Sequence, residues 1–521
     1  MASFSISSPT LFSPQNELPH SLSLRSSFFS AKFAPKSLVP TPRIRRVASE
    51  LLLVAASHRS FDVVVVGGGI IGLTIARQFL LGSDLSVAVV DKAVPCSGAT
   101  GAGQGYIWMT HKKPGTSIWD LAMRSHALWQ KLVRSLSDEG LDPEETLGWK
   151  NTGSLLVGRT PEECVALKKK VRELSEAGLR SEYLSSSDLL LKEPALLVDS
   201  DTGAAFLPDD SQIDAHRAVV FIEKGNRKLA SEGRYAEFYH EPVTGLIRLD
   251  GNKQVYGVQT SKSSLYGKKA IIVAAGCWSG SLMHELLKDS NISVDVPVKP
   301  RKGHLLVVEN FDSFHLNHGL MEAGYVDHQS RTPSHPSSLL GSDDDDVERM
   351  LSISMTATMD NMENLVLGSS REFAGFNTDA DDSIIRCIWD RAGEFFPKLR
   401  EMPLEDFIRN RKVRVGLRPY MPDGKPVIGA VPGLPNLYLA AGHEGGGLSM
   451  NLPSSMPLSF LEEFFSRLFG QEDHRLTYHL VEDRFDRSHV SEHRSSGLRL
   501  NMLCPIRFWS RRHRFLRNIY I

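Results

Sequence analysis

The chain has 521 residues, of which 41% are hydrophobic and 23% are charged, and its formal net charge is -1. Its length allows two or more domains, and its composition is ordinary for a globular protein. The nearly neutral charge argues against a nucleic-acid partner. No apolar run reaches the roughly 18–20 residues of a transmembrane segment, so none is expected. The 5 cysteines are scattered without metal-ligand spacing, so we interpret them as reduced thiols and expect no metal.

Residues 1–57 have the composition of a targeting segment. They are rich in Ser and Pro, and Glu17 is the one acidic residue before Glu50. The basic residues here are Arg25, Lys32, Lys36, Arg43, Arg45 and Arg46. This composition is typical of an organelle transit peptide, and the Met-Ala-Ser start with abundant serine favours a chloroplast over a mitochondrion. A disordered tail without a targeting role is the alternative.

The segment from Phe61 to Ala76, FDVVVVGGGIIGLTIA, predicts a strand, a glycine turn and a helix. Val63 to Val66 are β-branched, as expected for a parallel strand that is buried on both faces. The turn has the pattern G-x-G-x-x-G, formed by Gly67, Gly69 and Gly72. These glycines allow a tight turn, the close approach of a pyrophosphate and close helix–strand packing, and the helix N-terminus attracts the phosphates.

A second strand, Ser86 to Val90, ends at Asp91. An acidic side chain about twenty residues after the glycine turn accepts the hydroxyl groups of an adenosine ribose. The two features together predict a dinucleotide site, and a glycine-rich turn without a ligand is the alternative. Pro95 to Gly105 then forms a second loop of small residues, which allows backbone groups to approach the same ligand.

Helices and strands continue to alternate along the chain. We expect helices over Thr116–Ser135 and Glu162–Ala177, a strand over Thr152–Val157, a strand, turn and helix over Ala204–Ala218, and strands over Tyr256–Thr260 and within Lys268–Gly280. In the helix that begins at Glu162, Val165, Leu167 and Leu174 are expected to face inward. Asp214 is the expected N-cap of the helix that ends at Ala218.

The last third of the chain predicts a separate sheet and a return to the cofactor domain. Lys299–Val308 and Asn364–Gly368 are expected strands of that sheet, separated by a polar insertion, Gln329–Glu348. Its four adjacent aspartates are interpreted as part of a solvated loop rather than a cation site. Strands and glycine turns recur in Arg414–Pro419, Pro426–Gly429 and Leu437–Met450. The cofactor domain is therefore expected to be discontinuous.

These segments resemble, in order, those of the FAD-dependent D-amino-acid oxidase superfamily, within its glycine oxidase, sarcosine oxidase and opine oxidase or hydrogen cyanide synthase branch. The chain is similar to a plant organellar member. The resemblance covers Phe61 to Met450 and rests on FDVVVVGGGIIGLTIA, TGSLLV, AAFLPDDSQIDAHRA, AAGCWSG, VKPRKGHLLV, VGLRPYMPDGKPVIG and YLAAGHEGGGLSM. It implies an α/β fold with a Rossmann-type, glutathione-reductase-like FAD-binding domain (58–145, 203–296 and 412–468). Inserted in it is an α+β substrate domain on an antiparallel sheet (146–202 and 297–411).

The resemblance implies that FAD is the cofactor. The residues it assigns to FAD are Gly67, Gly69, Ile70, Ile71, Gly72, Asp91, Lys92, Ser97, Thr100, Gly103, Gly105, Gly276, Gly442, His443, Gly445, Gly446, Gly447 and Leu448. Relatives carry an Arg-Asn-Gly-Gly type stretch where this chain has Gly101–Gly105, so the contacts there differ. Members with covalent flavin place a cysteine where this chain has Pro419–Pro422, so non-covalent FAD is expected.

By the same resemblance, Arg418 binds the substrate carboxylate beside the flavin, since a planar guanidinium can bind a carboxylate through two hydrogen bonds. An interdomain ion pair is the alternative role for Arg418. Tyr325 is the second catalytic candidate and would close or polarise the substrate pocket. The equally favoured alternative is that Tyr325 is an ordinary tyrosine of the core or the surface. His443 is expected to be a satisfied structural histidine near the flavin rather than a base. Glu444 is left unassigned.

The resemblance implies oxidation of a small amino acid or N-substituted amino acid by hydride transfer from its α-carbon to flavin N5. The imine then hydrolyses to an oxo acid, and oxygen or another acceptor takes the electrons. The substrate partner is therefore a small amine that bears a carboxylate. Alternatives are a 2-hydroxy-acid dehydrogenase, an FAD-containing assembly factor without turnover, and an enzyme that acts on modified RNA bases, which the neutral charge disfavours.

The resemblance ends near Met450, and the composition changes there. Two prolines at Pro453 and Pro457 disfavour a helix, and no lysine follows Lys425. The segment 469–521 is rich in Arg and His, and we expect it to be poorly ordered, as in an alternative splice product or a shifted reading frame. A basic arm for nucleic acid or anionic lipid is the other interpretation.

Overall fold

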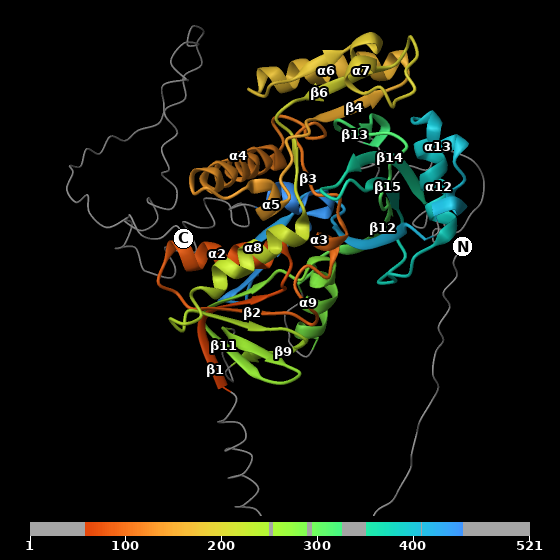
Figure 1. Cartoon of the computed structure of the whole chain (residues 1–521). Helices are drawn as coiled ribbons and strands as arrows, with labels where there is room; N and C mark the ends of the chain where they lie inside the picture. Colours follow the sequence, from red (N-terminus) through yellow and green to blue (C-terminus); the bar gives the residue numbers. More distant parts are fainter. Residues whose placement is uncertain (1–57, 249–253, 289–293, 326–350, 408, 452–521) are drawn as a thin grey trace, which may run out of the picture. The chain divides into compact units, whose positions relative to one another are not determined.

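The computed structural model describes residues 58–248, 254–288, 294–325, 351–407 and 409–451 (Figure 1). These residues belong to one compact unit that contains two eight-stranded sheets. The expected leader at 1–57, the polar insertion at 329–348 and the tail at 469–521 lie outside the described residues. In the described ranges, no helix is both long enough and apolar enough to cross a membrane.

The first sheet has a parallel centre in the order β18–β11–β1–β2–β8. Its strands are β1 (His58–Val66), β2 (Val87–Val90), β8 (Tyr235–Phe238), β9 (Val243–Arg248), β10 (Val255–Thr260), β11 (Ser264–Val273), β17 (Val427–Ala430) and β18 (Leu437–Ala441). Val63 and Val65 pack under α2 (Ile70–Gly82) and α8 (Ala215–Arg227). Val64 and Val66 pack on the other face with α9 (Ser279–Leu287). Burial on both faces explains the β-branched run of β1.

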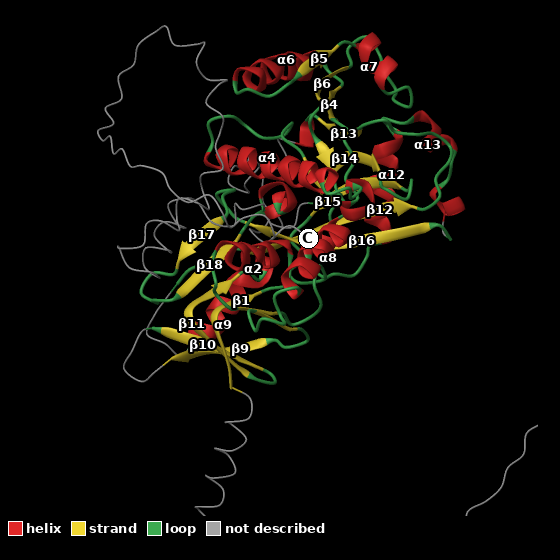
Figure 2. Cartoon of the chain, turned by 60° about the vertical axis from the view of Figure 1, so that its left-hand side comes forward, coloured by secondary structure: helices red, strands yellow, loops and turns green. Residues whose placement is uncertain are grey.

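The second sheet has the order β16–β12–β15–β14–β13–β4–β6–β5 and is antiparallel except for the pair β13–β4. Its strands are β4 (Ser154–Gly158), β5 (Glu182–Leu184), β6 (Gly203–Leu207), β12 (Lys299–Val308), β13 (Gly319–Glu322), β14 (Ser352–Met359), β15 (Leu365–Arg371) and β16 (Arg411–Tyr420). One face packs against α12 (Asp382–Gly393) and α13 (Pro397–Glu401), which Figure 2 shows beside β12 and β14. The opposite face borders the site described below.

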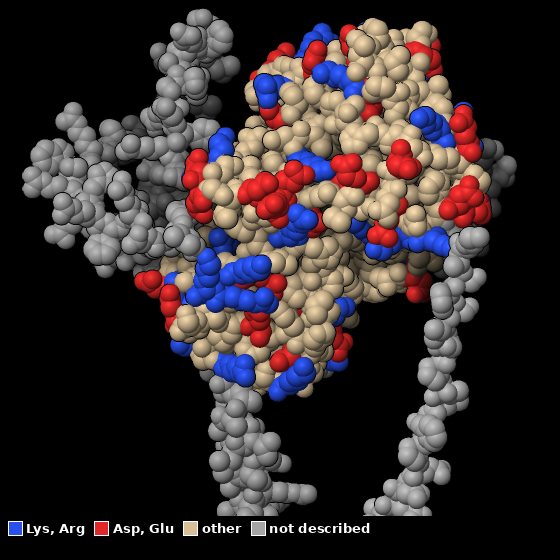
Figure 3. Space-filling model, in the orientation of Figure 1, with Lys and Arg blue, Asp and Glu red and all other residues tan. Residues whose placement is uncertain are grey.

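The remaining helices and short strands link the strands of the two sheets. They are α3 (Ala99–Ala102), β3 (Tyr106–Ile107), α4 (Ser117–Asp138), α5 (Pro143–Leu147), α6 (Pro161–Glu176), α7 (Ser186–Lys192), β7 (Ser211–Gln212), η1 (Gly276–Trp278), η2 (Leu404–Phe407), η3 (Glu444–Gly446) and η4 (Leu448–Met450). β3 and β7 form a small antiparallel ladder of their own. On the face shown in Figure 3, basic and acidic side chains are interspersed, in keeping with the nearly neutral net charge.

The expected fold class and most expected elements are confirmed. Asp214 is the N-cap of α8, where its side chain accepts a hydrogen bond from the Arg217 amide at 2.9 Å. In α6, Leu167 and Leu174 are buried as expected, but the expectation for Val165 is wrong, because this side chain is 68% exposed. The buried stripe of α6 runs through Cys164 instead, and successive helical residues point about 100° apart.

Two expected boundaries of the FAD-binding domain do not coincide with the division of the strands between the two sheets. The sequence places 203–296 and 412–468 in the FAD-binding part, yet β6 and β16 are strands of the second sheet. β16 pairs with β12 along its whole length, from Lys299↔Tyr420 to Val308↔Arg411. The sheet to which a strand belongs depends on its partner, which the local pattern does not specify. The chain therefore returns to the first sheet only after Tyr420.

Candidate active site

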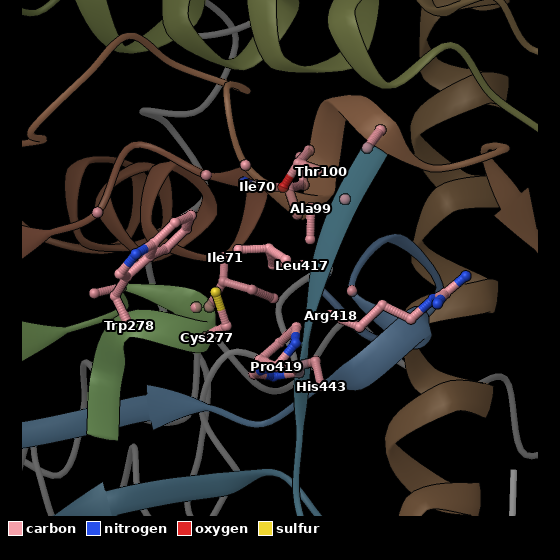
Figure 4. Close-up of a pocket in the computed structure, with 18 of the residues that line it drawn as sticks. Ile70, Ile71, Ala99, Thr100, Cys277, Trp278, Leu417, Arg418, Pro419 and His443 are labelled. Carbon is pink, nitrogen blue, oxygen red and sulfur yellow. Dashed lines mark hydrogen bonds between the residues drawn. The ribbon is translucent and has the colours of Figure 1, made fainter. Parts of the chain in front are cut away.

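A cavity of about 620 Å³ lies between the glycine turn after β1 and the free face of the second sheet. Figure 4 shows Ile70, Thr100 and Trp278 on one side of it, and Arg418 extending from β16 away from Trp278. The predicted residues that line it are Gly67, Gly69, Ile70, Ile71, Asp91, Lys92, Ser97, Thr100, Gly103, Gly105, Gly276, Tyr325, Arg418, His443, Gly445, Gly447 and Leu448. The structure thus brings together residues that are far apart in the sequence.

Three predicted glycines do not line the cavity. Gly72 packs helix α2 against the turn, because a Cβ there would overlap the Gly67 carbonyl oxygen. A Cβ on Gly442, which has a φ of +84°, would overlap Met421, and one on Gly446 would overlap Met450. These glycines allow close packing behind the site rather than contact with a ligand in it.

The turn after β1 leaves backbone donors open. Gly67 has a φ of +124°, and a Cβ there would overlap the Ala274 carbonyl oxygen. Gly69 caps α2 without a side-chain hydrogen bond, and the first turn of α2 carries no acidic residue. The Ile70 amide donates to Thr100 Oγ1 at 3.3 Å. The Gly67 amide donates to the Val90 carbonyl oxygen and the Gly68 amide donates to Asp91. The amides of Gly69, Ile71 and Gly72 remain open among the described residues, so the site favours an anionic group.

Asp91 stands beside this turn, held by backbone groups. Its Oδ2 accepts from the Gly68 amide at 2.6 Å and its Oδ1 accepts from the Ala93 amide at 2.7 Å. An ionised carboxylate has about four lone-pair sites, so acceptor capacity remains for ribose hydroxyl groups. The next residue, Lys92, places its ammonium 3.7 Å from the centre of the Trp278 ring.

Arg418 reaches the cavity from the second sheet. It lies opposite Arg301 on β12, so the two side chains share one face of the antiparallel pair. Its Nη1 donates to the Ser370 carbonyl oxygen at 3.0 Å, and a Cβ on Gly303 would overlap its guanidinium. The side chain therefore crosses β12 at Gly303. Burial lowers the pKa of Arg418, but an arginine starts so high that it remains charged.

The turn after β18 contributes His443 and Glu444. Burial lowers the pKa of His443 to about 4, so its ring is neutral at pH 7. Its Nε2 is buried and has no hydrogen-bond partner among the described residues. The expected structural role of His443 near the flavin stays a prediction. Glu444 Oε1 pairs with Arg301 Nη1 at 3.0 Å, and the Arg301 side chain is only 7% exposed.

The profile of the family described as FAD dependent oxidoreductase (DAO) matches residues 62–452. The chain belongs to this family. It is 29% identical over 403 residues to the glycine oxidase of Pseudomonas aeruginosa, which covers 74% of this chain and 90% of the relative. It is 26% identical over 309 residues to a D-amino acid dehydrogenase of Vibrio vulnificus, and this match covers 59% of this chain and 63% of the relative. The solved glycine oxidase of Geobacillus kaustophilus has a TM-score of 0.60 at 19% identity, over 78% of this chain and 95% of that one.

The described residues fit the FAD of this family. The open amide groups of α2 suit a pyrophosphate, and Asp91 retains acceptors for a ribose. At the other end, His443 and the glycine cradle at Gly445 and Gly447 line the cavity. Cys96 and Cys277 also line it, but burial raises the pKa of both thiols to about 12. Both thiols are therefore protonated at neutral pH, and non-covalent FAD stays a prediction.

The sequence reasoning missed several residues at the site. Trp278 and Cys277 lie in the quoted segment AAGCWSG, whose glycine alone was assigned to FAD. Arg301 and Gly303 lie in VKPRKGHLLV, and the alternation of this strand was the signal that could have placed both on one face. Arg371 on β15, whose guanidinium lies 4.0 Å from the centre of the Tyr325 ring, gave no local signal, because its position depends on the pairing of β15 with its neighbours.

Proposed function

We propose that this FAD-dependent oxidoreductase oxidises the carbon–nitrogen bond of a small amino acid or N-substituted amino acid, giving an imine that hydrolyses to an oxo acid. One observation carries the proposal. Arg418 extends from the second sheet into the cavity that the glycine turn of the first sheet lines, and no ion pair of Arg418 occurs among the described residues. Relatives named glycine oxidase and D-amino acid dehydrogenase support an amino-acid substrate.

Arg418 binds the carboxylate through two parallel N–H groups and so fixes the adjacent carbon. The Ser370 carbonyl oxygen and the floor at Gly303 hold the guanidinium in place. Bound FAD would supply the hydride acceptor for that carbon. Fixing the orientation of the reacting carbon contributes several kcal/mol to the rate enhancement, in the range known for intramolecular reactions, roughly 7–11 kcal/mol at most.

Two acid–base groups that line the cavity with Arg418 favour a reaction without a side-chain base on the α-carbon. Glu444 is held by Arg301, and His443 has a pKa of about 4, so it is a weak base at neutral pH. The unpartnered Nε2 of His443 is available for a hydrogen bond to cofactor or substrate. Transfer of a hydride from a bound neutral amine requires no base stronger than the imidazole of His443.

An anaerobic absorbance titration of the purified holoprotein tests the proposal. Amino acids, N-methyl amino acids and 2-hydroxy acids are added in turn, and loss of the oxidised-flavin band is followed. We expect an amine to bleach the band, and Arg418→Ala to raise the concentration needed by about 100-fold. Arg418→Lys should recover part of the effect, and Arg386→Ala, at an exposed ion pair, is the control.

Bleaching by hydroxy acids alone would replace the proposal with 2-hydroxy-acid oxidation. A flavin that no compound bleaches would contradict both and favour an assembly factor. Readmitting oxygen then identifies the electron acceptor, because rapid return of the band with peroxide indicates an oxidase. A slow return indicates a dehydrogenase with another acceptor.

A further inference from the structure

The cavity face of the second sheet carries a second arginine. Ser369 on β15 lines the cavity, and side chains two residues apart on a strand share a face, so Arg371 points to the same side. An isolated bridge joins Lys302 to Glu372, which places Arg371 across from Gly303. Arg418 crosses β12 at that glycine, so its guanidinium extends toward Arg371.

Arg371 is buried without a full set of partners. Its side chain is only 2% exposed, and Nη1 donates to Ser354 Oγ at 3.3 Å. Nη2 is buried and has no hydrogen-bond partner among the described residues. The guanidinium lies 4.0 Å from the centre of the Tyr325 ring, and Tyr325 lines the cavity. An unpartnered charged donor in this position is costly unless an anion or another acceptor reaches it.

A second buried donor lies near Tyr325. The hydroxyl of Tyr106 makes no hydrogen bond of good geometry, although Thr356 and Thr358, which also hydrogen-bond with Gln104 and Gln212, are its nearest hydroxyl neighbours. Tyr106 also lines the cavity. Burial and the nearby Tyr325 raise the pKa of Tyr106 well above its usual value, so its hydroxyl remains a donor.

The charges on this face do not balance. Arg301 is neutralised by Glu444, as described above. No carboxylate of the described residues pairs with Arg418 or with Arg371, so two buried guanidinium charges remain. One substrate carboxylate neutralises one of them. The two guanidinium charges favour a further anionic group over an amide or an apolar group, and the unpartnered hydroxyl of Ser369, which lines the cavity, can donate to such a group.

We propose that the substrate is a diacid, which deepens the proposed function and rests on it. Arg418 binds the carboxylate next to the oxidised carbon. The second acidic group binds on the Tyr106 and Tyr325 side, where it accepts a hydrogen bond from the Tyr106 hydroxyl and is attracted by Arg371. Amino acids with an acidic side chain, and amines with two carboxymethyl groups, have this chemistry.

Binding of non-oxidisable acids to the oxidised holoprotein tests the subsite independently of turnover. Succinate and succinamate differ by one acid-to-amide change, and perturbation of the flavin spectrum gives their dissociation constants. We expect succinate to bind at least about tenfold more tightly, as for a charge-assisted hydrogen bond. Arg371→Met and Tyr106→Phe should each bring the two constants closer together, and Arg371→Lys should preserve part of the difference. Arg386→Met is the matched control and should leave the ratio unchanged.

Equal binding of succinate and succinamate by the wild type would overturn the proposal, even if the variants fail to fold. A ratio that neither Arg371→Met nor Tyr106→Phe alters would also overturn it. The reaction itself is tested with aspartate against asparagine and glutamate against glutamine, in both enantiomers. A diacid preference without bleaching by any amine would retain the subsite and reject amine oxidation. Bleaching by amines without a preference for diacids would retain amine oxidation and reject the subsite.

Discussion

The guanidinium of Arg418 lies directly over Gly303, on the neighbouring strand, where a Cβ would overlap it. In the β12–β16 register, Arg418 lies opposite Arg301, two residues before Gly303 on β12. Its side chain therefore reaches the Ser370 carbonyl oxygen only by crossing this glycine. A residue without a side chain thus sets the position of the residue that we assign to the substrate carboxylate.

Gly303→Ala should weaken substrate binding without loss of the fold. The added methyl group displaces the flexible end of Arg418, which costs little stability but moves the guanidinium. We expect the substrate concentration for half-maximal flavin bleaching to rise about tenfold. Gly429→Ala on β17 is the matched control, since a Cβ there meets no atom within 4 Å. An unchanged titration in Gly303→Ala would contradict the assigned path of Arg418.

Gly72→Ala should prevent stable FAD binding. A Cβ at Gly72 overlaps backbone, the Gly67 carbonyl oxygen, so the turn after β1 has to move. We expect loss of bound flavin and a lower melting temperature, measured by absorbance ratio and thermal unfolding. Gly245→Ala, whose Cβ would have ordinary contacts, should retain both. Full flavin content in Gly72→Ala would show that close packing is not required at this position.

Glu444→Gln should destabilise the protein by removing the carboxylate that pairs with the buried guanidinium of Arg301. Breaking a buried ion pair costs about 3–5 kcal/mol, and the partial exposure of Glu444 reduces this to about 1–3 kcal/mol. Chemical denaturation of the wild type and the variant measures the difference. Glu405→Gln, which breaks an exposed pair with Arg386, should have little effect. Equal stability of the wild type and Glu444→Gln would show that the pair contributes nothing.

His443 should make stability depend on acid pH. Its pKa of about 4 in the folded protein lies below the usual 6.5, so below pH 6.5 the unfolded chain binds the proton more tightly. The stability of the wild type relative to His443→Asn should be constant above about pH 7. It should fall by about 2–3 kcal/mol as the pH decreases from 6.5 to 4. Denaturation at several pH values measures it, and a difference that is independent of pH would contradict the shifted pKa.

Local patterns were sufficient to predict the first crossover and the cofactor class. The run Val63–Val66, the glycines that follow and Asp91 are close in sequence, and their geometry is determined by short-range sterics. Most expected strands were confirmed for the same reason. The prediction that Val165 faces inward was wrong, because the hydrophobicity of this residue did not reveal which stripe of α6 faces the core.

What the sequence did not reveal depends on pairing between distant strands. β16 carries Arg418 and has the pattern of any strand, so nothing local assigned it to the second sheet. The pairing of Arg301 with Glu444 joins residues that are 143 positions apart. The unpartnered donors of Arg371 and Tyr106 emerge only when the chain is folded, because hydrogen-bond satisfaction is a property of the assembled site.

The order of strands in the first sheet has a consequence for biosynthesis. β1 leaves the ribosome early, its neighbours β2 and β11 follow, and β18, which covers the far edge of β11, is complete only at Ala441. A nascent chain therefore exposes an apolar central strand edge until translation is nearly finished. FAD cannot be enclosed before the turn at Gly445 and Gly447 has emerged. Chaperone occupancy and the supply of free flavin at the end of synthesis, rather than the rate of early folding, should set the yield of holoprotein.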